Sequence, residues 1–152
     1  MRVLILAVGR LKSGPLLELQ REYAQRFTWP LEIREVEERR ALAPAERKAR
    51  EGELLLDALP EGALPVALDE RGKPLGSRDF AQQLGRWREA GTKTLAFILG
   101  GADGLPRPVL ERAALTLSLG AMTWPHLLAR TLLLEQLYRS QQILAGHPYH
   151  RD

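Results

Sequence analysis

Residues 3–8 read VLILAV, a continuous apolar run bounded by a basic residue and a glycine. A short run of this kind predicts a strand that is buried on both faces of a parallel sheet. It is too short to be the apolar core of a signal peptide. A helical pattern follows from Pro15 to about Phe27, with Ser13 as its predicted cap. A buried strand followed by a helix is the start of an alternating α/β pattern.

Strands and helices alternate along the whole chain. Further strands are predicted at residues 31–36, 64–68, 95–99 and 115–119, and further helices at 44–59, 77–90, 108–114 and 125–145. Five strands alternating with five helices predict a three-layer α/β fold with a mostly parallel sheet of five to six strands. No linker, repeat or low-complexity segment interrupts the alternation. Residues 1–152 are therefore expected to form a single domain.

Local sequence features refine this pattern. Ser77 is the predicted cap of the third helix, and Gly146 with Pro148 ends the last one. Gly52 interrupts an otherwise favourable helix, because glycine lowers helix propensity. Residues 69–76 are rich in turn formers, and we expect a turn there.

The composition is that of a soluble globular protein, with 45% hydrophobic and 27% charged residues among 152. There is no cysteine, which excludes disulfides, thiolate catalysis and cysteine-bound zinc. The net charge of +3 permits a nucleic-acid partner without requiring one. The apolar run Leu132–Leu134 is flanked by Arg130 and Glu135, and no apolar run reaches membrane-spanning length. We expect a cytoplasmic protein with no membrane partner.

The last predicted helix is apolar on nearly every side. Its apolar residues form three faces, namely Leu127, Leu134 and Tyr138, then Leu128, Leu132 and Ile143, then Leu133, Leu137 and Leu144. A helix that covers one sheet needs a single apolar stripe, so this helix is expected to be buried on more than one side. A second copy of the chain would bury it in a homodimer, which is the interpretation we favour. A central helix within the monomer's own core is the alternative.

Parallel α/β sheets bind ligands at the carboxyl ends of their strands, and three of the predicted loops lie there. Residues 9–14 read GRLKSG, but Pro15 and Leu16 stand where a phosphate-binding loop requires Lys and Ser or Thr, so a simple turn is the better interpretation. Residues 100–104 read GGADG, whose glycines permit a ligand to approach the backbone closely. Residues 120–125 read GAMTWP, a mixture that suits a flat aromatic ligand such as adenine. For these two loops a packed turn is the competing interpretation.

All three histidines and two of the three tyrosines lie in the last 27 residues. The chain ends in the tail His147–Asp152, which reads HPYHRD. Chain ends usually fray, and a frayed end has no need of imidazole, phenol and guanidinium groups side by side. We therefore expect the tail to be held in place and used.

Six short motifs are spread over the chain: AVG at residues 7–9, LD at 68–69, LGGxxGL at 99–105, TxPH at 123–126, LYR at 137–139 and HPYHR at 147–151. Together they resemble the ribosomal RNA large-subunit methyltransferase H family, and the resemblance covers the whole chain. It implies a fold of the SPOUT class with a deep trefoil knot at the carboxyl-terminal end. It also implies an S-adenosylmethionine cofactor, a homodimer and, as substrate, N3 of a pseudouridine in 23S rRNA on the assembled ribosome.

The resemblance also implies a set of cofactor-binding residues. These are Leu68, Gly101, Gly120, Ala121, Met122, Thr123, Trp124 and Pro125. Gly120 and Trp124 stand where relatives more often have Ser and Leu. Because most contacts in this class are made by the backbone, we expect cofactor binding to be retained.

The implied chemistry is attack by a ring nitrogen on the methyl carbon of a sulfonium, and this nitrogen is nucleophilic only after deprotonation. Candidate groups that accept the proton or stabilise the anion are His126, Arg130, Arg139, Tyr149, His150 and Arg151. We expect the tail to close over the site, with Tyr149 stacking on the target base and His150 or Arg151 handling charge. A structural role is an even alternative for His126 and the better one for His147. A metal site at His147, His150 and Asp152 is a minor alternative, and we expect no metal.

Two other functions remain open from the sequence. One is a SPOUT methyltransferase that acts on another RNA, such as tRNA. The other is a non-catalytic, flavodoxin-like module that binds a nucleotide or the ribosome. The residues alone support only an α/β ligand-binding domain with a late glycine-rich site, and the RNA substrate rests on the resemblance.

Overall fold

The computed structural model describes all of residues 1–152. Its elements in chain order are β1 (Arg2–Val8), α1 (Pro15–Arg26), β2 (Leu31–Val36), α2 (Pro44–Ala58), β3 (Leu64–Pro74), α3 (Ser77–Glu89), β4 (Thr94–Leu99), α4 (Arg107–Arg112), β5 (Leu115–Ser118) and α5 (His126–Leu144). The predicted alternation of five strands and five helices is confirmed.

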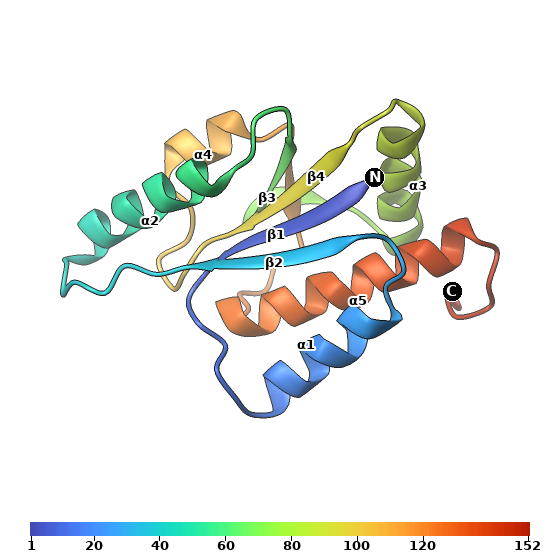
Figure 1. The fold of residues 1–152 in the computed structure, drawn as a ribbon, viewed down its shortest axis with the longest axis horizontal. Coiled ribbons are helices and arrows are strands. Elements are labelled where there is room, and N and C mark those ends of the chain that lie inside the picture. Colours follow the sequence, from blue (N-terminus) through green and yellow to red (C-terminus); the bar gives the residue numbers. More distant parts are fainter.

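The strands form one sheet in the order β2-β1-β4-β3-β5, and every neighbouring pair is parallel. Helices α1, α3 and α5 cover one face of the sheet, and α2 and α4 cover the other (Figure 1). The predicted three-layer α/β fold with a parallel sheet is therefore confirmed. The trefoil knot implied by the family resemblance stays a prediction.

The buried strand β1 divides its side chains between two hydrophobic cores, because successive residues of a strand point to opposite faces. Val3, Ile5 and Ala7 pack toward α3 and α5. The alternate residues Leu4, Leu6 and Val8 join the second core, which α2 and α4 cover. The side chains at positions 3 to 6 have no exposed surface, and full burial of an aliphatic side chain contributes about 1.5–3 kcal/mol.

The third strand is longer than the sequence predicts. It continues beyond Leu68 to Pro74, and it pairs with β5 again at Lys73 and Pro74 after a shift in register. The prediction of a turn over residues 69–76 is therefore wrong. The turn-forming residues instead make a bulge, which lets one strand bend without leaving the sheet.

The two predicted serine caps are also wrong. Gly14 occupies the cap position of α1, so Ser13 lies one residue too far out. Gly76 occupies the cap position of α3, and the Ser77 hydroxyl instead donates to Gln136 Oε1 at 2.7 Å. Both α1 and α3 are therefore preceded by a glycine at the cap position, and neither has a capping side chain.

Glycine has a low helix propensity, but at position 52 it allows α2 to pack closely against a neighbouring segment. A Cβ atom at this position would lie 2.2 Å from Pro106 Cγ, so a larger residue would push α2 away from the segment before α4. The glycine thereby holds α2 close to the loop that follows β4.

The apolar helix α5 lies against the sheet between α1 and α3 (Figure 1). Tyr138 packs beside Tyr23 of α1, with 6.2 Å between ring centroids, and Leu144 packs against Gly85 of α3. The chain itself thus covers the helix on several sides, while Leu128 and Leu132 stay partly exposed. The homodimer stays a prediction. None of the helices has the length and apolar content needed to cross a membrane.

Candidate active site

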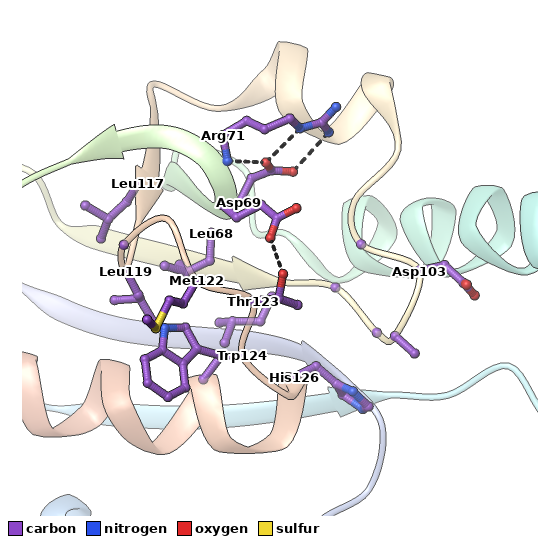
Figure 2. Close-up of a pocket in the computed structure, with 18 of the residues that line it drawn as sticks. Leu68, Asp69, Arg71, Asp103, Leu117, Leu119, Met122, Thr123, Trp124 and His126 are labelled. Carbon is purple, nitrogen blue, oxygen red and sulfur yellow. Dashed lines mark hydrogen bonds and ion pairs between the residues drawn. The ribbon is translucent and has the colours of Figure 1, made fainter.

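A cavity of about 330 Å³ lies at the bulge of β3 and at the carboxyl ends of β4 and β5 (Figure 2). Most of its wall comes from three segments, residues 68–71, 99–104 and 117–126, and Lys48 and Ala129 complete it. This is the edge where ligands of parallel α/β sheets bind. The two late loops that the sequence singled out therefore face the same space.

Six of the eight residues predicted to bind the cofactor line this cavity. They are Leu68, Gly101, Gly120, Met122, Thr123 and Trp124. Ala121 and Pro125 lie in the same loop, but their side chains are exposed and they do not line the cavity. The structure thus brings together residues that lie more than 50 positions apart in the sequence.

The bulge in β3 supplies polar groups that the sequence analysis missed. The Asp69 carboxylate accepts hydrogen bonds from the Arg71 backbone N–H at 2.8 Å and from Arg71 Nε at 3.1 Å. Burial on its own raises the pKa of Asp69, but the bonds from Arg71 outweigh it and the net pKa is lowered. Asp69 is therefore a fixed anion in the cavity wall. The sequence did not predict this role of Asp69, because residues 69–76 resemble an ordinary turn.

The bulge also fixes the loop that follows β5. Thr123 Oγ1 donates to Glu70 Oε2 at 2.8 Å (Figure 2). Ser118 Oγ donates to the Glu70 carbonyl oxygen at 3.0 Å. The same Ser118 hydroxyl accepts the Gly120 N–H at 3.1 Å. These bonds hold residues 118–124 across the cavity at both ends of the loop.

The glycine loop after β4 is tightly folded. The Gly104 N–H donates to the Gly101 carbonyl oxygen at 3.1 Å. A Cβ atom at Gly100 would lie 2.7 Å from the Gly104 backbone, so only glycine fits there. At its three glycines the loop therefore presents backbone to the cavity, and Asp103 adds a carboxylate.

Apolar surface is exposed at the mouth of the cavity. Met122 is 75% exposed and Trp124 is 42% exposed, although both are large hydrophobic residues. Both side chains belong to the loop held by Thr123, and both line the cavity (Figure 2). Exposed apolar groups beside a cavity are typical of ligand-binding sites.

His126 and Arg130 both lie in the first turns of α5 but have different surroundings. His126 lines the cavity and lies against Gly9. Burial, and then the charge of Arg130, lower the pKa of His126 below its ordinary value of 6.5. The imidazole is therefore neutral at pH 7 and able to accept a proton.

Arg130 instead has a structural environment. It is 1% exposed, and its guanidinium donates to Glu35 Oε2 at 2.6 Å and to the Gly9 carbonyl oxygen at 3.1 Å. These contacts join α5 to the ends of β1 and β2. Arg130 does not line the cavity, so its predicted place among the reacting groups is not supported by its position.

The tail is held in place, as the sequence predicts, and it packs along α5. The Tyr149 ring meets Tyr138 edge to face with 4.8 Å between centroids, and its hydroxyl donates to Glu135 Oε1 at 3.1 Å. The Arg139 guanidinium lies 4.9 Å from the centre of the Tyr149 ring. Burial, followed by the bond to Glu135, raises the pKa of Tyr149 to about 12.

The rest of the tail is tied to the same cluster. Arg139 Nη1 lies 3.1 Å from His150 Nδ1, and Asp152 forms a two-pronged ion pair with Arg78 at 2.8 and 2.7 Å. Arg151 is exposed. No group of three or more His, Asp or Glu residues is placed to hold a metal ion.

The tail does not close over the cavity of its own chain. No residue of His147–Asp152 lines that cavity. Glu135, which anchors the tail, lies nine residues beyond His126 along α5, or about 14 Å at 1.5 Å per residue. Glu135 instead borders a second hollow of about 440 Å³, which shares Trp124 with the first. Of the predicted catalytic residues, His126 thus lies at the cavity, Tyr149, His150 and Arg151 lie in the tail, and Arg130 belongs to neither group.

These features define a class of protein: an α/β domain whose parallel sheet carries a ligand cavity on its late loops. The chain matches a family model described as "Predicted SPOUT methyltransferase" over residues 1–150, and it belongs to this family. Two curated relatives carry the name ribosomal RNA large subunit methyltransferase H. The relative from Paramagnetospirillum magneticum is 57% identical over 151 residues, and the one from Rhodospirillum centenum is 54% identical; each match covers 99% of both chains. The resemblance found in the sequence is confirmed.

Solved structures share the fold at low sequence identity. A probable methyltransferase from Bordetella pertussis is 18% identical, with a TM-score of 0.61 over 91% of this chain and 95% of its own. Ribosomal RNA small subunit methyltransferase E from Neisseria gonorrhoeae, solved with S-adenosyl methionine bound, is 15% identical, with a TM-score of 0.53 over 95% of this chain and 66% of its own.

Proposed function

We propose that this protein is an S-adenosylmethionine-dependent methyltransferase that modifies N3 of a pseudouridine in 23S rRNA on the assembled ribosome. The observation that carries the proposal is the cavity, which gathers six of the eight residues expected to bind the cofactor. The names of the curated relatives support ribosomal RNA as the substrate. Because ribosomes are the proposed substrate, we place the protein in the cytoplasm.

The cavity has the size and the lining that this cofactor needs. Its volume of about 330 Å³ lies at the lower end of the usual range for small-molecule sites. Trp124 and Met122 offer apolar surface to an adenine ring, and the glycine loop lets a ligand approach the backbone closely. When bound, the cofactor supplies an electrophilic methyl carbon for attack by the ring nitrogen.

The residues of the chain align the base and manage its proton. His126, neutral at pH 7, can accept the proton of the ring nitrogen at the cavity. Tyr149 keeps its own proton at that pH, because its pKa is about 12. We therefore assign Tyr149 to stacking on the base rather than to proton transfer, and Arg139 and His150 to the charge that develops near it.

The separation of the cavity from the chain's own tail supports a homodimer in which each tail serves the partner's cavity. Mixing two inactive variants tests this arrangement: a chain lacking residues 147–152, and a full-length chain with His126→Asn. A mixed dimer then holds one site with an intact cavity and an intact tail, and mixing is expected to restore about a quarter of wild-type activity. Mixtures that stay inactive would contradict the exchange of tails.

The substrate is tested with purified protein, labelled cofactor and three acceptors: intact ribosomes, free 23S rRNA and tRNA. We expect label in intact ribosomes alone, on a nucleoside that mass spectrometry identifies as a methylated pseudouridine. Label in tRNA would favour the alternative SPOUT function. Calorimetry that detects flavin mononucleotide binding, without S-adenosylmethionine binding, would favour a non-catalytic module.

A further inference from the structure

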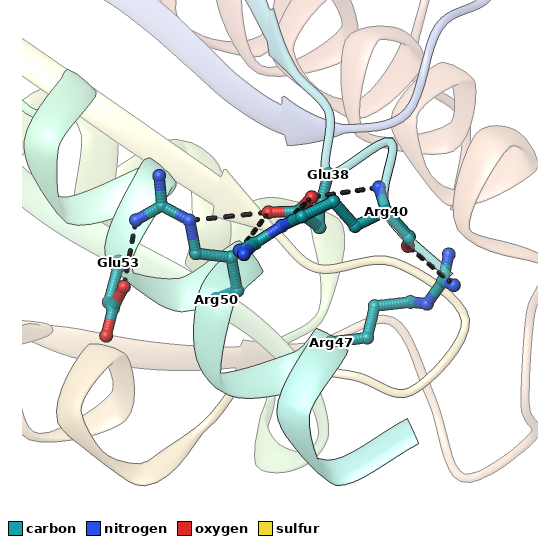
Figure 3. Close-up of polar contacts among 5 residues, drawn as sticks. All are labelled: Glu38, Arg40, Arg47, Arg50 and Glu53. Atoms are coloured by element: carbon teal, nitrogen blue, oxygen red, sulfur yellow. Dashed lines mark hydrogen bonds and ion pairs between the residues drawn. The ribbon is translucent and has the colours of Figure 1, made fainter. Parts of the chain in front are cut away.

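Glu51 on α2 is a buried carboxylate without a partner. The residue is 6% exposed, and its Oε1 atom accepts no hydrogen bond. Glu38, which lies nearby on the segment before α2, has a side chain that is also only 8% exposed, but Arg40 and Arg50 pair with it (Figure 3). Buried acids without such partners are rare in folded proteins, because desolvation of the charge is unfavourable.

The Glu51 carboxylate lies directly behind the glycine loop of the cavity. A Cβ atom at Gly101 would lie 2.9 Å from Glu51 Oε2 and 3.2 Å from Glu51 Oε1. Gly101 lines the cavity, whereas Glu51 does not. A single glycine, without a side chain, therefore separates this carboxylate from the cavity.

The charges of the cavity wall already favour a cation. The wall contains the acids Asp69, Glu70 and Asp103 and the bases Lys48 and Arg71. Glu51 adds a further acid behind the wall, and burial, followed by the charge of Asp103, raises its pKa. A positive charge in the cavity would stabilise the ionised form of Glu51 and offset its desolvation.

We propose that Glu51 makes the site prefer the sulfonium form of the cofactor over its uncharged thioether product. The inference rests on the proposed function, since it takes S-adenosylmethionine as the ligand. Transfer of the methyl group removes the positive charge from sulfur, so the attraction to Glu51 ends when the reaction is complete. Glu51 is a positioning residue that acts across Gly101 and touches no reacting atom.

The expected preference is about tenfold. A unit charge roughly 12 Å away contributes this much at an effective dielectric constant near 20, and a closer charge contributes more. S-adenosylhomocysteine differs from the cofactor only by the missing methyl group and charge. Comparison of the two ligands therefore reports the contribution of the positive charge to the affinity. Sinefungin, which carries a protonated amine at the same position, restores the charge without a sulfonium.

The experiment measures the Kd of these three ligands by calorimetry for the wild type, Glu51→Gln and the matched control Glu53→Gln. Glu53 lies two residues away on α2 with an exposed side chain. We expect Glu51→Gln to raise the Kd of S-adenosylmethionine and of sinefungin about tenfold, while the Kd of S-adenosylhomocysteine changes less than twofold. We expect Glu53→Gln to change none of them. A thermal melt without ligand is expected to show equal or higher stability for Glu51→Gln, because an unpaired buried charge is removed.

A second variant separates charge from packing. Glu51→Asp keeps the charge on a shorter side chain, and we expect it to retain the wild-type ratio of affinities. An unchanged ratio in Glu51→Gln, or an equal loss of ratio in both variants, would overturn the inference. If the wild type bound none of the three ligands, the proposed function itself would fail, which is a different result from an unchanged ratio.

Discussion

The two ends of α5 carry different halves of the candidate site. At its amino-terminal end, His126 faces the cavity and Arg130 ties the helix to the ends of β1 and β2. Toward its carboxyl-terminal end, from the middle of the helix onward, Glu135 and Arg139 hold the tail through Tyr149. We propose that the amino-terminal end serves cofactor binding and proton transfer, and that the tail held farther along the helix positions the target base. Changes at the two ends are therefore expected to have separable effects.

Deletion of residues 147–152 is expected to have the largest effect. The tail supplies the proposed stacking ring and His150 beside it, and loss of groups that orient a substrate reduces rates by about 100-fold or more. Ribosome methylation should fall by this much, while the Kd for S-adenosylmethionine changes less than twofold and the chain stays folded and dimeric. Tritium transfer, calorimetry and light scattering measure the three quantities. Unchanged methylation would contradict any role of the tail.

His126→Asn tests the cavity end of the helix and is expected to lower kcat about 100-fold. The wild type should lose activity as the pH falls through the pKa of His126, which lies below 6.5, because only the neutral imidazole accepts a proton. The variant should lack this acidic limb. Single-turnover rates between pH 5 and 8 show whether the acidic limb is present in the wild type and absent in the variant. A wild-type profile without an acidic limb would assign His126 to the structural role that its contact with Gly9 also permits.

Gly101→Ala is expected to raise the Kd of S-adenosylmethionine about 30-fold, with a smaller change in kcat at saturating cofactor. The added Cβ would lie 2.9 Å from Glu51 Oε2 and 3.0 Å from Val8 Cγ1, both packed behind the loop, and we expect this crowding to displace the loop toward the cavity. Gly76→Ala is the matched control, because a Cβ there has only Asp79 nearby, at 3.8 Å. Equal affinities for the two variants, measured by calorimetry, would mean that Gly101 does not shape the binding site.

Features that depend on local sequence were predicted, and features that depend on contacts between distant residues were not. Apolar periodicity located every strand and helix, and the glycines at 100–104 marked the cavity, because these patterns are local. The bulge at residues 69–72 was missed, since it depends on pairing between β3 and the distant β5. Glu51 was missed for the same reason: its significance comes from contact with Gly101, 50 residues away. The tail was recognised as fixed, but its place on α5 depends on Glu135 and Tyr138, which no local pattern links to Tyr149.

Tyr149→Phe is expected to have the smallest effect, because the ring that stacks is kept and only the hydroxyl is lost. Activity should fall about threefold, in line with the loss of one hydrogen bond to a partly exposed carboxylate. The raised pKa means that the bond to Glu135 holds the tail below pH 10, the ordinary tyrosine value, and is lost as the pH rises through about 12. Absorbance at 295 nm should therefore show a last phenol titrating near pH 12 in the wild type and not in the variant. A variant as inactive as the tail deletion would instead place the hydroxyl in the proton transfer, and the division of work between the two ends of α5 would no longer hold.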